Sequence, residues 1–502
     1  MPTRRNVLKA GAVAGGLLLA SQLTRSGSPG APTGVPAGAN GISGGGSHDE
    51  SHETHEDPPD DGSSSPPHST LAPFSRPMPL SPTLRPVRRD AEADYYRITM
   101  AETEAEILPG MSTPVFTYEG YFPGPTIRAH AGRRVIVEQL NLLDRPTAVH
   151  LHGGVVAARD DGNPMDPIPP GGARTYSYPN EQAAAPLWFH DHAHHAESEH
   201  VYRGLAGFYL LHDGPERRLG LPGGKFDVPI MIRDAQLGQH GELVYVANNQ
   251  PGRTTVLVNG VPDPYFTVDA RKYRFRLLNA ANMGFFRLQL SDGEFVQIGS
   301  DRGLLAAPYR TRQLYLSPGE RADVVVDFSR YRVGGHVDLC RLATVDAEPV
   351  PILRFMVVPA THDPSVVPDH LATLPPVREP DVTRDFSLRT EGTAFTINGR
   401  TYDHTRVDTA VRWGDTEEWR VTNDDPMAHN LHLHLVEFRV VDRDGRPPDP
   451  GEAGLKDTVR IGPGETVRLR ATFDTFEGRY VYHCHLLDHS SMGMMAVMDI
   501  GR

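Results

Sequence analysis

The chain has 502 residues, and a single hydrophobic core rarely organises so many, so we expect two to four domains. Its formal net charge of −13 at pH 7 argues against a nucleic-acid-binding protein. Glycine (49) and proline (45) are frequent and the hydrophobic fraction is only 38%, a composition that favours turn-rich β-structure over long helices.

The first residues contain an arginine pair, Arg4 and Arg5, followed by the short apolar run AGAVAGGLLLA. This pattern resembles a Tat export signal, which we place over residues 1–25, although Val7 stands where an aromatic residue is usual. A plain Sec signal and an uncleaved anchor are the alternatives, but the apolar run is short for a membrane span. We therefore expect an exported protein that is periplasmic, extracellular or at the cell surface, with no stable span in the mature chain.

Residues 26–90 are rich in glycine, serine, proline and acidic residues, and they contain too little apolar surface to fold. We predict a disordered linker here. His48, His52 and His55 lie in this segment among acidic residues. Capture of copper by these histidines is the alternative to a plain solvated linker, which the composition favours.

Three stretches that begin at residues 124, 255 and 395 resemble one another. Each runs from an extended segment through a turn into an alternating strand that ends at an asparagine: Asn141, Asn279 or Asn423. In each copy a Pro-Gly turn then precedes a second alternating strand, and period-two alternation is typical of half-buried strands. The sequence therefore predicts an all-β chain with three β-sandwich domains at residues 91–218, 225–360 and 380–502.

Four His-x-His pairs lie on apolar, strand-like stretches. In a strand, residues i and i+2 share a face, so each pair presents two imidazoles side by side in a chelating arrangement. A single buried pair is often only hydrogen-bonded, but four pairs at matching places in the first and third repeats predict a metal centre. The pairs are His150/His152, His190/His192, His432/His434 and His483/His485.

Cys484 stands between His483 and His485, and its side chain faces the other side of the strand. One strand can therefore serve two metal sites. The candidate partners of Cys484 are His429, His489 and Met494. Two histidines, a cysteine and a weakly bound methionine form the ligand set of a blue-copper site.

Alternatives remain for this second site. Zinc also takes cysteine and histidine, but it rarely takes methionine and would not account for the eight paired histidines. Met492, Met495 and Met498 compete with Met494 for the axial position. The other cysteine, Cys340, lies on an alternating stretch, and we interpret it as a buried apolar residue rather than a disulfide partner.

Taken in chain order, the histidine pairs and the motif His-Cys-His-x3-His-x4-Met resemble those of the multicopper oxidases. The likeness runs from Tyr95 to the C-terminus. FPGPTI, VHLHGG, WFHDHA and HLHLVEFRVVDR are most similar to the group of bacterial spore-coat laccases, phenoxazinone synthase and bilirubin oxidase. The resemblance implies three cupredoxin-like Greek-key domains, and a second domain that mainly holds the other two in place.

The resemblance also implies four copper ions per chain. The type 1 copper would be held by His429, Cys484, His489 and Met494. The type 2 copper would take His150 and His432. The type 3 pair would take His152, His190, His192, His434, His483 and His485.

The implied activity is that of a laccase-like oxidase, which couples one-electron oxidation of phenols or aromatic amines to the four-electron reduction of dioxygen to water. Electrons would enter through an exposed edge of His489 and pass from Cys484 to its histidine neighbours. Oxidation of cuprous, ferrous or manganous ions is the alternative, although no methionine-rich insert is evident. A non-catalytic copper-binding or structural relative is less favoured because all twelve ligand positions are filled. We expect a monomer, because a chain of this kind can complete its own cluster.

Three positions need separate comment. Asp161 matches an acidic residue near the dioxygen site of the laccases, so we predict that it tunes cluster waters or relays protons; a turn residue before Gly162 is the alternative. Ser490 stands where this group usually has a glutamate, which puts the usual proton path in doubt. Asn430 replaces the family's proline, which removes a φ constraint but no ligand.

Three further histidines, His194, His195 and His200, follow the second pair. We interpret them as surface residues or neighbours of the ligands, and not as ligands. The identity of the physiological electron donor is not encoded in any motif that we recognise.

Overall fold

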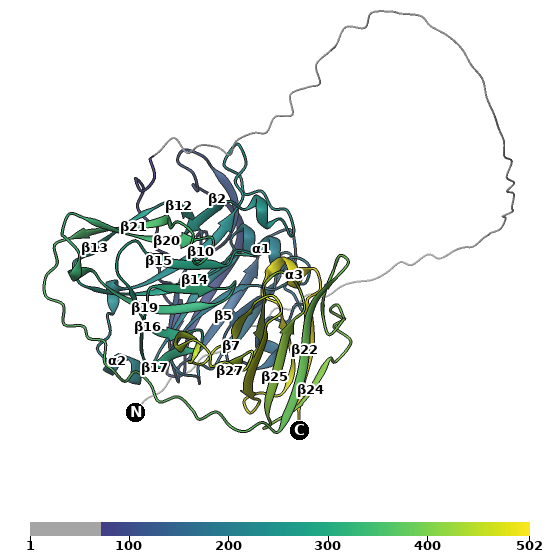
Figure 1. The fold of residues 1–502 in the computed structure, drawn as a ribbon. Helices are drawn as coiled ribbons and strands as arrows, with labels where there is room; N and C mark the ends of the chain where they lie inside the picture. The colour runs from purple at the N-terminus through teal and green to yellow at the C-terminus, as the bar shows by residue number, and fades with distance from the viewer. Residues whose placement is uncertain (1–71) are drawn as a thin grey trace, which may run out of the picture. The chain divides into compact units, whose positions relative to one another are not determined.

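Six β-sheets, arranged as three sandwiches, make up the part of the chain that the computed structural model describes, residues 72–502 (Figure 1). The predicted all-β fold of three sandwiches is confirmed. The predicted export signal and the three linker histidines lie outside the described residues. Within 72–502, no helix has the length and apolar character needed to cross a membrane.

The first sandwich pairs a sheet of order β1-β2-β5-β7, with β3 on β2, with a sheet of order β4-β9-β8-β6. Side chains such as Ile98, Val137 and Tyr209 fill the core between them. The strands are β1 Arg88–Arg89, β2 Ala93–Ala105, β3 Thr113–Tyr118, β4 Ile127–His130, β5 Arg134–Asn141, β6 Val149–His152, β7 Ala173–Tyr178, β8 Ala185–Asp191 and β9 Ala206–His212.

The second sandwich pairs a sheet of order β12-β11-β10-β14-β19-β16-β17 with one of order β13-β21-β20-β15-β18. Its core contains Phe275, Val324 and Phe355. The strands are β10 Asp227–Ala235, β11 Thr255–Val258, β12 Val261–Pro262, β13 Tyr265–Asp269, β14 Lys272–Asn279, β15 Phe286–Leu290, β16 Phe295–Ser300, β17 Gly303–Thr311, β18 Gln313–Leu316, β19 Arg321–Asp327, β20 His336–Leu342 and β21 Val350–Val358. Cys340 is buried on β20, and both cysteines are free thiols.

The third sandwich pairs a sheet of order β23-β22-β25-β29-β27 with one of order β24-β31-β30-β26-β28. Its core contains Trp419, Leu469 and Tyr482. The strands are β22 Val382–Glu391, β23 Ala394–Ile397, β24 Thr409–Arg412, β25 Thr416–Asn423, β26 His429–Leu433, β27 Phe438–Arg443, β28 Thr458–Ile461, β29 Thr466–Thr472, β30 Gly478–His483 and β31 Met495–Gly501.

Helices are few and short. The two that matter for function are α1, Glu197–Arg203, and α3, Leu487–Ser491, which lie in contact with each other although 283 residues separate the end of one from the start of the other (Figure 1). The remaining helix is α2, Gly214–Arg218. Short 3-10 helices cover η1 Ala158–Asp160, η2 Gly224–Phe226, η3 Gln250–Gly252, η4 Phe328–Arg330 and η5 Pro450–Glu452.

The three asparagines of the repeat occupy equivalent positions. In each sandwich the side-chain amide donates to two or three nearby backbone carbonyls, and the side-chain oxygen accepts the N–H two residues later. The backbone carbonyl of Asn141, Asn279 and Asn423 also accepts from the N–H of the Pro-Gly turn, at Gly171, Gly319 and Gly464 respectively. These bonds satisfy buried backbone groups where the strand ends, which explains why the same residue recurs three times.

The predicted disordered linker is wrong for residues 72–90. Met78 is buried in the second core, and its N–H donates to the carbonyl of Tyr265 at 2.6 Å. The N–H of Leu84 donates to Thr126 in the first sandwich, and Arg88–Arg89 forms β1. The physical reason is that a few buried apolar side chains, together with backbone hydrogen bonds to neighbouring sheets, suffice to order residues 72–90. The proline-rich composition alone indicates an unfolded segment.

Candidate metal centre

The four histidine pairs lie on neighbouring strands. β6 pairs with β8 so that His150 is opposite His190, and β26 pairs with β30 so that His432 is opposite His483. The first and third sandwiches therefore each bring four imidazoles to the end of one sheet. All eight side chains are buried: His150, His152, His190, His192, His432, His434, His483 and His485.

Ring nitrogens from the first and third sandwiches converge in three groups. Nε2 of His483 lies 3.2 Å from Nε2 of His192 and 3.3 Å from Nε2 of His434. Nε2 of His150 lies 3.4 Å from Nε2 of His432. In the third group, nitrogens of three rings lie within 4.8 Å of one another: His152, His190 and His485. Convergent imidazole nitrogens at this spacing are a ligand arrangement for copper, iron, nickel or zinc.

In six of the eight rings, the ring nitrogen that points away from the converging group lies within hydrogen-bond distance of an oxygen atom. The other nitrogen is thereby left free to bind a metal. Backbone carbonyls lie 2.8 Å from Nδ1 of His150 (Asp161), of His190 (Asp191) and of His432 (Asp457). The carbonyl of Cys484 lies 3.0 Å from Nδ1 of His483. Carboxylates hold the last two: Asp161 lies 2.7 Å from Nδ1 of His434, and Asp457 lies 3.0 Å from Nε2 of His152.

The nitrogens that face inward include buried atoms with no hydrogen-bond partner among residues 72–502. They are Nδ1 of His152, Nε2 of His190 and both ring nitrogens of His485. Leaving so many polar atoms unsatisfied in the interior costs free energy, and bound metal ions at the centre of each group would remove that cost. The residues present therefore fit a metal cluster.

Electrostatics favour the same interpretation. Burial lowers the pKa of His483 to about 4, and it lowers the pKa of six other rings well below the usual range. Water is excluded, so the charged imidazolium is disfavoured. At neutral pH these rings are uncharged, and their lone pairs are available for a metal without competition from protons.

A separate group of ligand atoms surrounds the only cysteine near the cluster. Nδ1 of His429 and Nδ1 of His489 lie 3.2 Å apart, at 3.6 Å and 3.9 Å from Sγ of Cys484. Asp425 lies 2.7 Å from Nε2 of His429 and fixes that ring. Burial raises the pKa of the Cys484 thiol to about 12, so the thiolate requires a bound cation to stabilise it.

Met494 is placed beside these three residues by the backbone. Its carbonyl accepts from the N–H of Cys484 at 3.0 Å, and its N–H donates to the carbonyl of His489 at 2.9 Å. The side chain is fully buried. Of its competitors, Met492 is 39% exposed, and Met495 and Met498 belong to β31. The axial assignment to Met494 remains a prediction that this placement favours.

The expectation of an exposed edge on His489 is wrong for this structure. The ring is fully buried, and the ring of Phe395 stacks on it with centroids 3.9 Å apart. Nε2 of His489 is buried without a hydrogen-bond partner among the described residues. Phe395 belongs to β23, and the chain beyond it is tied down because Tyr402 donates its N–H to the carbonyl of Gly493 at 2.9 Å.

The remaining predicted residues are placed as follows. Asp161 is buried and contacts His150 and His434, so it lies at the cluster; its part in proton delivery stays a prediction. His200 is buried 3.1 Å from a carboxylate oxygen of Asp191, and Nδ1 of His195 lies 2.9 Å from the carbonyl of Ser491. His194 stacks on His195. None of these three histidines belongs to a converging ligand group within 72–502.

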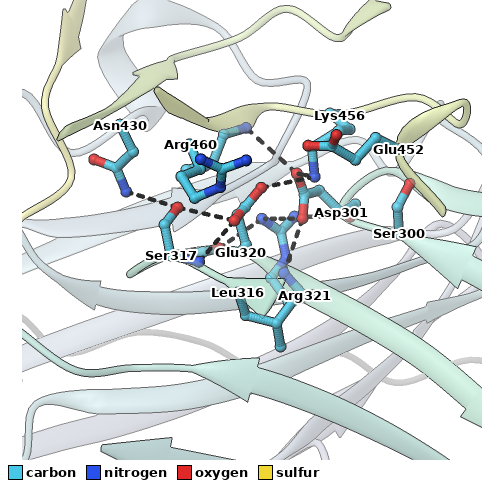
Figure 2. Close-up of polar contacts among 12 residues, drawn as sticks. Ser300, Asp301, Leu316, Ser317, Glu320, Arg321, Asn430, Glu452, Lys456 and Arg460 are labelled. Atoms are coloured by element: carbon cyan, nitrogen blue, oxygen red, sulfur yellow. Dashed lines mark hydrogen bonds and ion pairs between the residues drawn. The ribbon is translucent and has the colours of Figure 1, made fainter. Parts of the chain in front are cut away.

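Sequence reasoning missed a buried ion cluster between the second sandwich and the metal centre; Figure 2 shows its members Asp301, Glu320, Arg321 and Lys456. Arg321 is completely buried, and it donates to both carboxylate oxygens of Asp457 at 2.7 Å. It also donates to the carbonyl of Pro186 in the first sandwich. Lys456 pairs with Asp301 at 2.8 Å and with Glu320 at 3.1 Å. Charged residues within strand-like apolar stretches were the only signal available, and they do not identify their partners.

The second sandwich also reaches the metal ligands directly. Gly319 has a positive φ of 86°, and a Cβ there would lie 3.0 Å from Cγ of His485 and 3.2 Å from Cε1 of His152. Asn430 donates from its amide to Oγ of Ser317 and to the carbonyl of Pro318, as Figure 2 shows for Ser317. Its Oδ1 accepts from the N–H of His485 at 2.6 Å. The residue that replaces the family's proline therefore links two domains beside the cysteine.

Comparisons with known proteins agree with this geometry. Three family models, each described as Multicopper oxidase, match residues 99–216, 234–341 and 374–502. The chain is 35% identical to a laccase of Bacillus subtilis, over 86% of this chain and 99% of that protein. It is 36% identical to a bilirubin oxidase of Albifimbria verrucaria, over 85% of this chain and 81% of that protein.

Solved structures show the same likeness. A laccase from Pediococcus acidilactici superposes with a TM-score of 0.81 at 32% identity, over 88% of this chain and 96% of that one. A multicopper oxidase from Campylobacter jejuni, described as a metallo-oxidase, gives a TM-score of 0.76 at 25% identity, over 86% and 96%.

The family carries four copper ions per chain, one of type 1, one of type 2 and two of type 3, and the residue groups described above fit that number. The group of His429, Cys484 and His489 fits a type 1 ligand set, and the groups that the eight paired histidines form fit a trinuclear site. The chain belongs to the multicopper oxidase family and is an oxidoreductase.

Proposed function

We propose that this protein is a laccase-like oxidase that takes single electrons from phenols or aromatic amines and reduces dioxygen to water. The observation that carries the proposal is the position of Cys484, whose chain neighbours His483 and His485 belong to the trinuclear site. A covalent path of three consecutive residues therefore joins the two sites. Bound copper supplies the redox chemistry, and the protein supplies geometry, charge and protons.

The chain's own residues prepare both sites for this reaction. Asp425, Asp161 and Asp457 each hold one nitrogen of a ligand ring, which fixes the orientation of the opposite nitrogen. Phe395 covers His489 and keeps water from the type 1 site. In this proposal the donor gives up its electron across the Phe395 and His489 rings rather than by touching an exposed histidine edge.

Two observations support an aromatic donor. Two relatives that match 86% and 85% of the chain are named laccase and bilirubin oxidase. Among the described methionines only Met165 and Met492 are exposed, so residues 72–502 offer no surface cluster of soft sulfur ligands for cuprous ions. Oxidation of metal ions is the second candidate, because the Campylobacter jejuni structure is described as a metallo-oxidase.

Oxygen uptake by the copper-loaded protein decides between these donors. Phenols, aromatic amines and bilirubin should support faster uptake than cuprous, ferrous or manganous ions at equal concentration. Faster uptake with a metal ion than with every aromatic donor would assign the protein to the second candidate.

Replacing Cys484 with serine should have the largest effect of any single change. Cys484→Ser removes the thiolate, so the protein should lose its intense blue colour and all oxidation of donors, while three of four coppers remain bound. Absorption spectra and copper analysis measure this. Cys340→Ser is the matched control, since that buried thiol lies in the second sandwich, and it should leave colour and activity intact. A colourless Cys484→Ser protein with normal turnover would contradict the type 1 assignment.

Export by the Tat pathway and a monomeric state are also proposals. The twin-arginine sequence lies outside the described residues, so its support is the sequence pattern alone. Changing both Arg4 and Arg5 to lysine should retain the folded protein in the cytoplasm, as measured by fractionation. Light scattering of the purified protein tests for the monomer.

A further inference from the structure

Glu197 is a buried carboxylic acid that none of the copper sites uses. It is the first residue of α1, and its exposed fraction is 0%. α1 packs against α3, the helix that contains His489. Oγ of Ser490, also fully buried, donates a hydrogen bond to Oε1 of Glu197 at 3.0 Å. The serine that stands where a glutamate was expected is therefore in contact with a glutamate from another domain.

The environment of Glu197 favours the protonated form of its carboxyl group. No arginine or lysine within residues 72–502 forms an ion pair with it, and Oε2 is buried without a hydrogen-bond partner. Burial, with a smaller contribution from the charge of Asp191, raises the pKa of Glu197 to about 8, against the opposing effect of nearby hydrogen-bond donors such as the Ser490 hydroxyl. At pH 7 the group is a neutral acid whose hydroxyl hydrogen sits on the unpaired oxygen.

The groups that face Glu197 come from three elements. Asp191 belongs to β8 and lies between the ligands His190 and His192, Ser490 and Ser491 belong to α3, and Tyr402 precedes β24. None of them is a cation. Glu197 itself is five residues from His192 and has no hydrogen bond to a metal ligand. Asp191, which is flanked by two ligands of the trinuclear site, therefore couples Glu197 electrostatically to that site, although Glu197 is not one of its ligands.

We propose that Glu197 stores and supplies a proton for the reduction of dioxygen, and that the Ser490 hydroxyl is its positioning partner. Dioxygen takes four electrons from the donor and four protons to form two waters. Glu197 gives one of these protons from Oε2, becomes a carboxylate, and regains a proton from solvent before the next cycle. No other oxidant or reductant is required. The proposal rests on the oxidase assignment, but not on which donor the protein uses.

The direction of the pH dependence follows from the raised pKa. Below about pH 8 the proton is present and available, and above it the group is already ionised. The oxygen half-reaction should therefore slow as pH rises through about 8. A carboxyl with an ordinary pKa would be ionised throughout this range and would give no such step.

Infrared spectroscopy of the copper-loaded full chain tests the protonation state without turnover. The wild-type protein should show a protonated carboxyl C=O band at pH 7 that disappears as pH rises through about 8. Glu197→Gln should lack this band at every pH. Glu199→Gln is the matched control, because Glu199 lies two residues away on α1, half-buried, and pairs with Arg145 and Arg203; it should keep the band.

Reoxidation of the protein measures the role in catalysis. All coppers are first reduced chemically, then mixed with dioxygen, and the return of the blue colour is followed. Glu197→Gln should slow this step at least about 10-fold at pH 7 and remove its pH dependence, whereas Glu199→Gln should behave as wild type. Adding Ser490→Glu to Glu197→Gln restores a carboxyl on the α3 side of the same contact and should recover most of the rate.

Two results would overturn the proposal. One is a wild-type protein with no protonated carboxyl band assignable to glutamate at pH 7, which is measurable even if Glu197→Gln fails to fold. The other is a Glu197→Gln protein with four coppers and unchanged reoxidation. Because no organic or metal-ion donor enters either experiment, a wrong assignment of the donor leaves both results valid.

Discussion

Asp161 and Asp457 make equivalent contacts with the histidines of the trinuclear site. The backbone carbonyl of each aspartate holds the first histidine of a pair in its own domain, His150 or His432. The carboxylate of each reaches into the other domain and holds the second histidine there: Asp161 contacts His434 and Asp457 contacts His152. The first and third domains are thus linked by two reciprocal contacts, each from an aspartate of one domain to a histidine of the other.

The two carboxylates nevertheless have opposite acid–base character. Burial raises the pKa of Asp161, because no arginine or lysine within the described residues pairs with it. The guanidinium of Arg321 holds the pKa of Asp457 well below its usual range despite equal burial. The same geometry therefore gives Asp457 a lowered pKa, which suits it to fixing a ring as an anion, and gives Asp161 a raised pKa. The second sandwich creates this difference, since it supplies the arginine.

Removing the arginine should have the largest effect on this pair. Arg321→Met leaves Asp457 as a buried charge without a partner, and we expect a loss of about 3–5 kcal/mol in the free energy of unfolding. Denaturant titration of the copper-free protein measures it. Arg310→Met, which breaks an exposed pair with Glu294, should cost at most about 1 kcal/mol.

The double variant Arg321→Met/Asp457→Asn sharpens this test. It removes both charges, so it should be more stable than Arg321→Met alone. If both proteins are equally unstable, the loss comes from packing around Arg321 and not from the unpaired carboxylate.

Neutralising the other aspartate should affect chemistry more than stability. Asp161→Asn keeps an oxygen that accepts from His434 but has no acidic proton to donate, so we expect reoxidation by dioxygen to slow about 10- to 100-fold. Reduction of the type 1 site by a donor should be unchanged, and stopped-flow absorbance separates the two steps. Asp160→Asn, at a buried neighbour that accepts from the N–H of Ser177, should leave both rates as they are. Equal slowing of both steps would contradict a role at the dioxygen site.

The smallest expected effect concerns the hydroxyl of Thr458, which lies beside Asp457 and has no counterpart beside Asp161. Thr458 follows Asp457 and places Oγ1 3.0 Å from Nε2 of His152, whereas Gly162 follows Asp161. Thr458→Val should cost about 1 kcal/mol of stability, since the buried contacts of the hydroxyl with Asp457, His152 and His432 are lost without a change of shape. Thr422→Val, at a half-buried Thr–Thr contact with Thr466, is the control and should leave copper binding unaffected. A Thr458→Val protein as stable as wild type would show that the Thr458 hydroxyl does not distinguish the contacts of Asp457 from those of Asp161.

Much of the fold was predictable because it repeats. Alternating strands, the asparagine at each strand end and the Pro-Gly turn occur three times, and the structure gives them one shared set of hydrogen bonds. The paired histidines were predictable for a related reason: spacing along a strand fixes which side chains share a face. These features are local, so the sequence contains them directly.

The unpredicted features depend on contacts between distant residues. His152 and Asp457 are 305 positions apart, and no local pattern indicates that they touch. Arg321 looks like an ordinary strand residue until its partners from three domains are known. The burial of His489 depends on Phe395, and the contact of Ser490 with Glu197 joins two short helices from different domains. Charge and burial are decided by such neighbours, so sequence alone left the proton path unresolved.

The division of the cluster between two domains has a consequence for assembly. The first and third sandwiches each contribute four of the eight rings, so neither can build the trinuclear site before the two have docked. Binding free energy from the cluster therefore stabilises the docked arrangement rather than either domain alone. A chain supplied with copper late should therefore dock reversibly until copper binds, and a chelator should weaken the interface before it unfolds a sandwich.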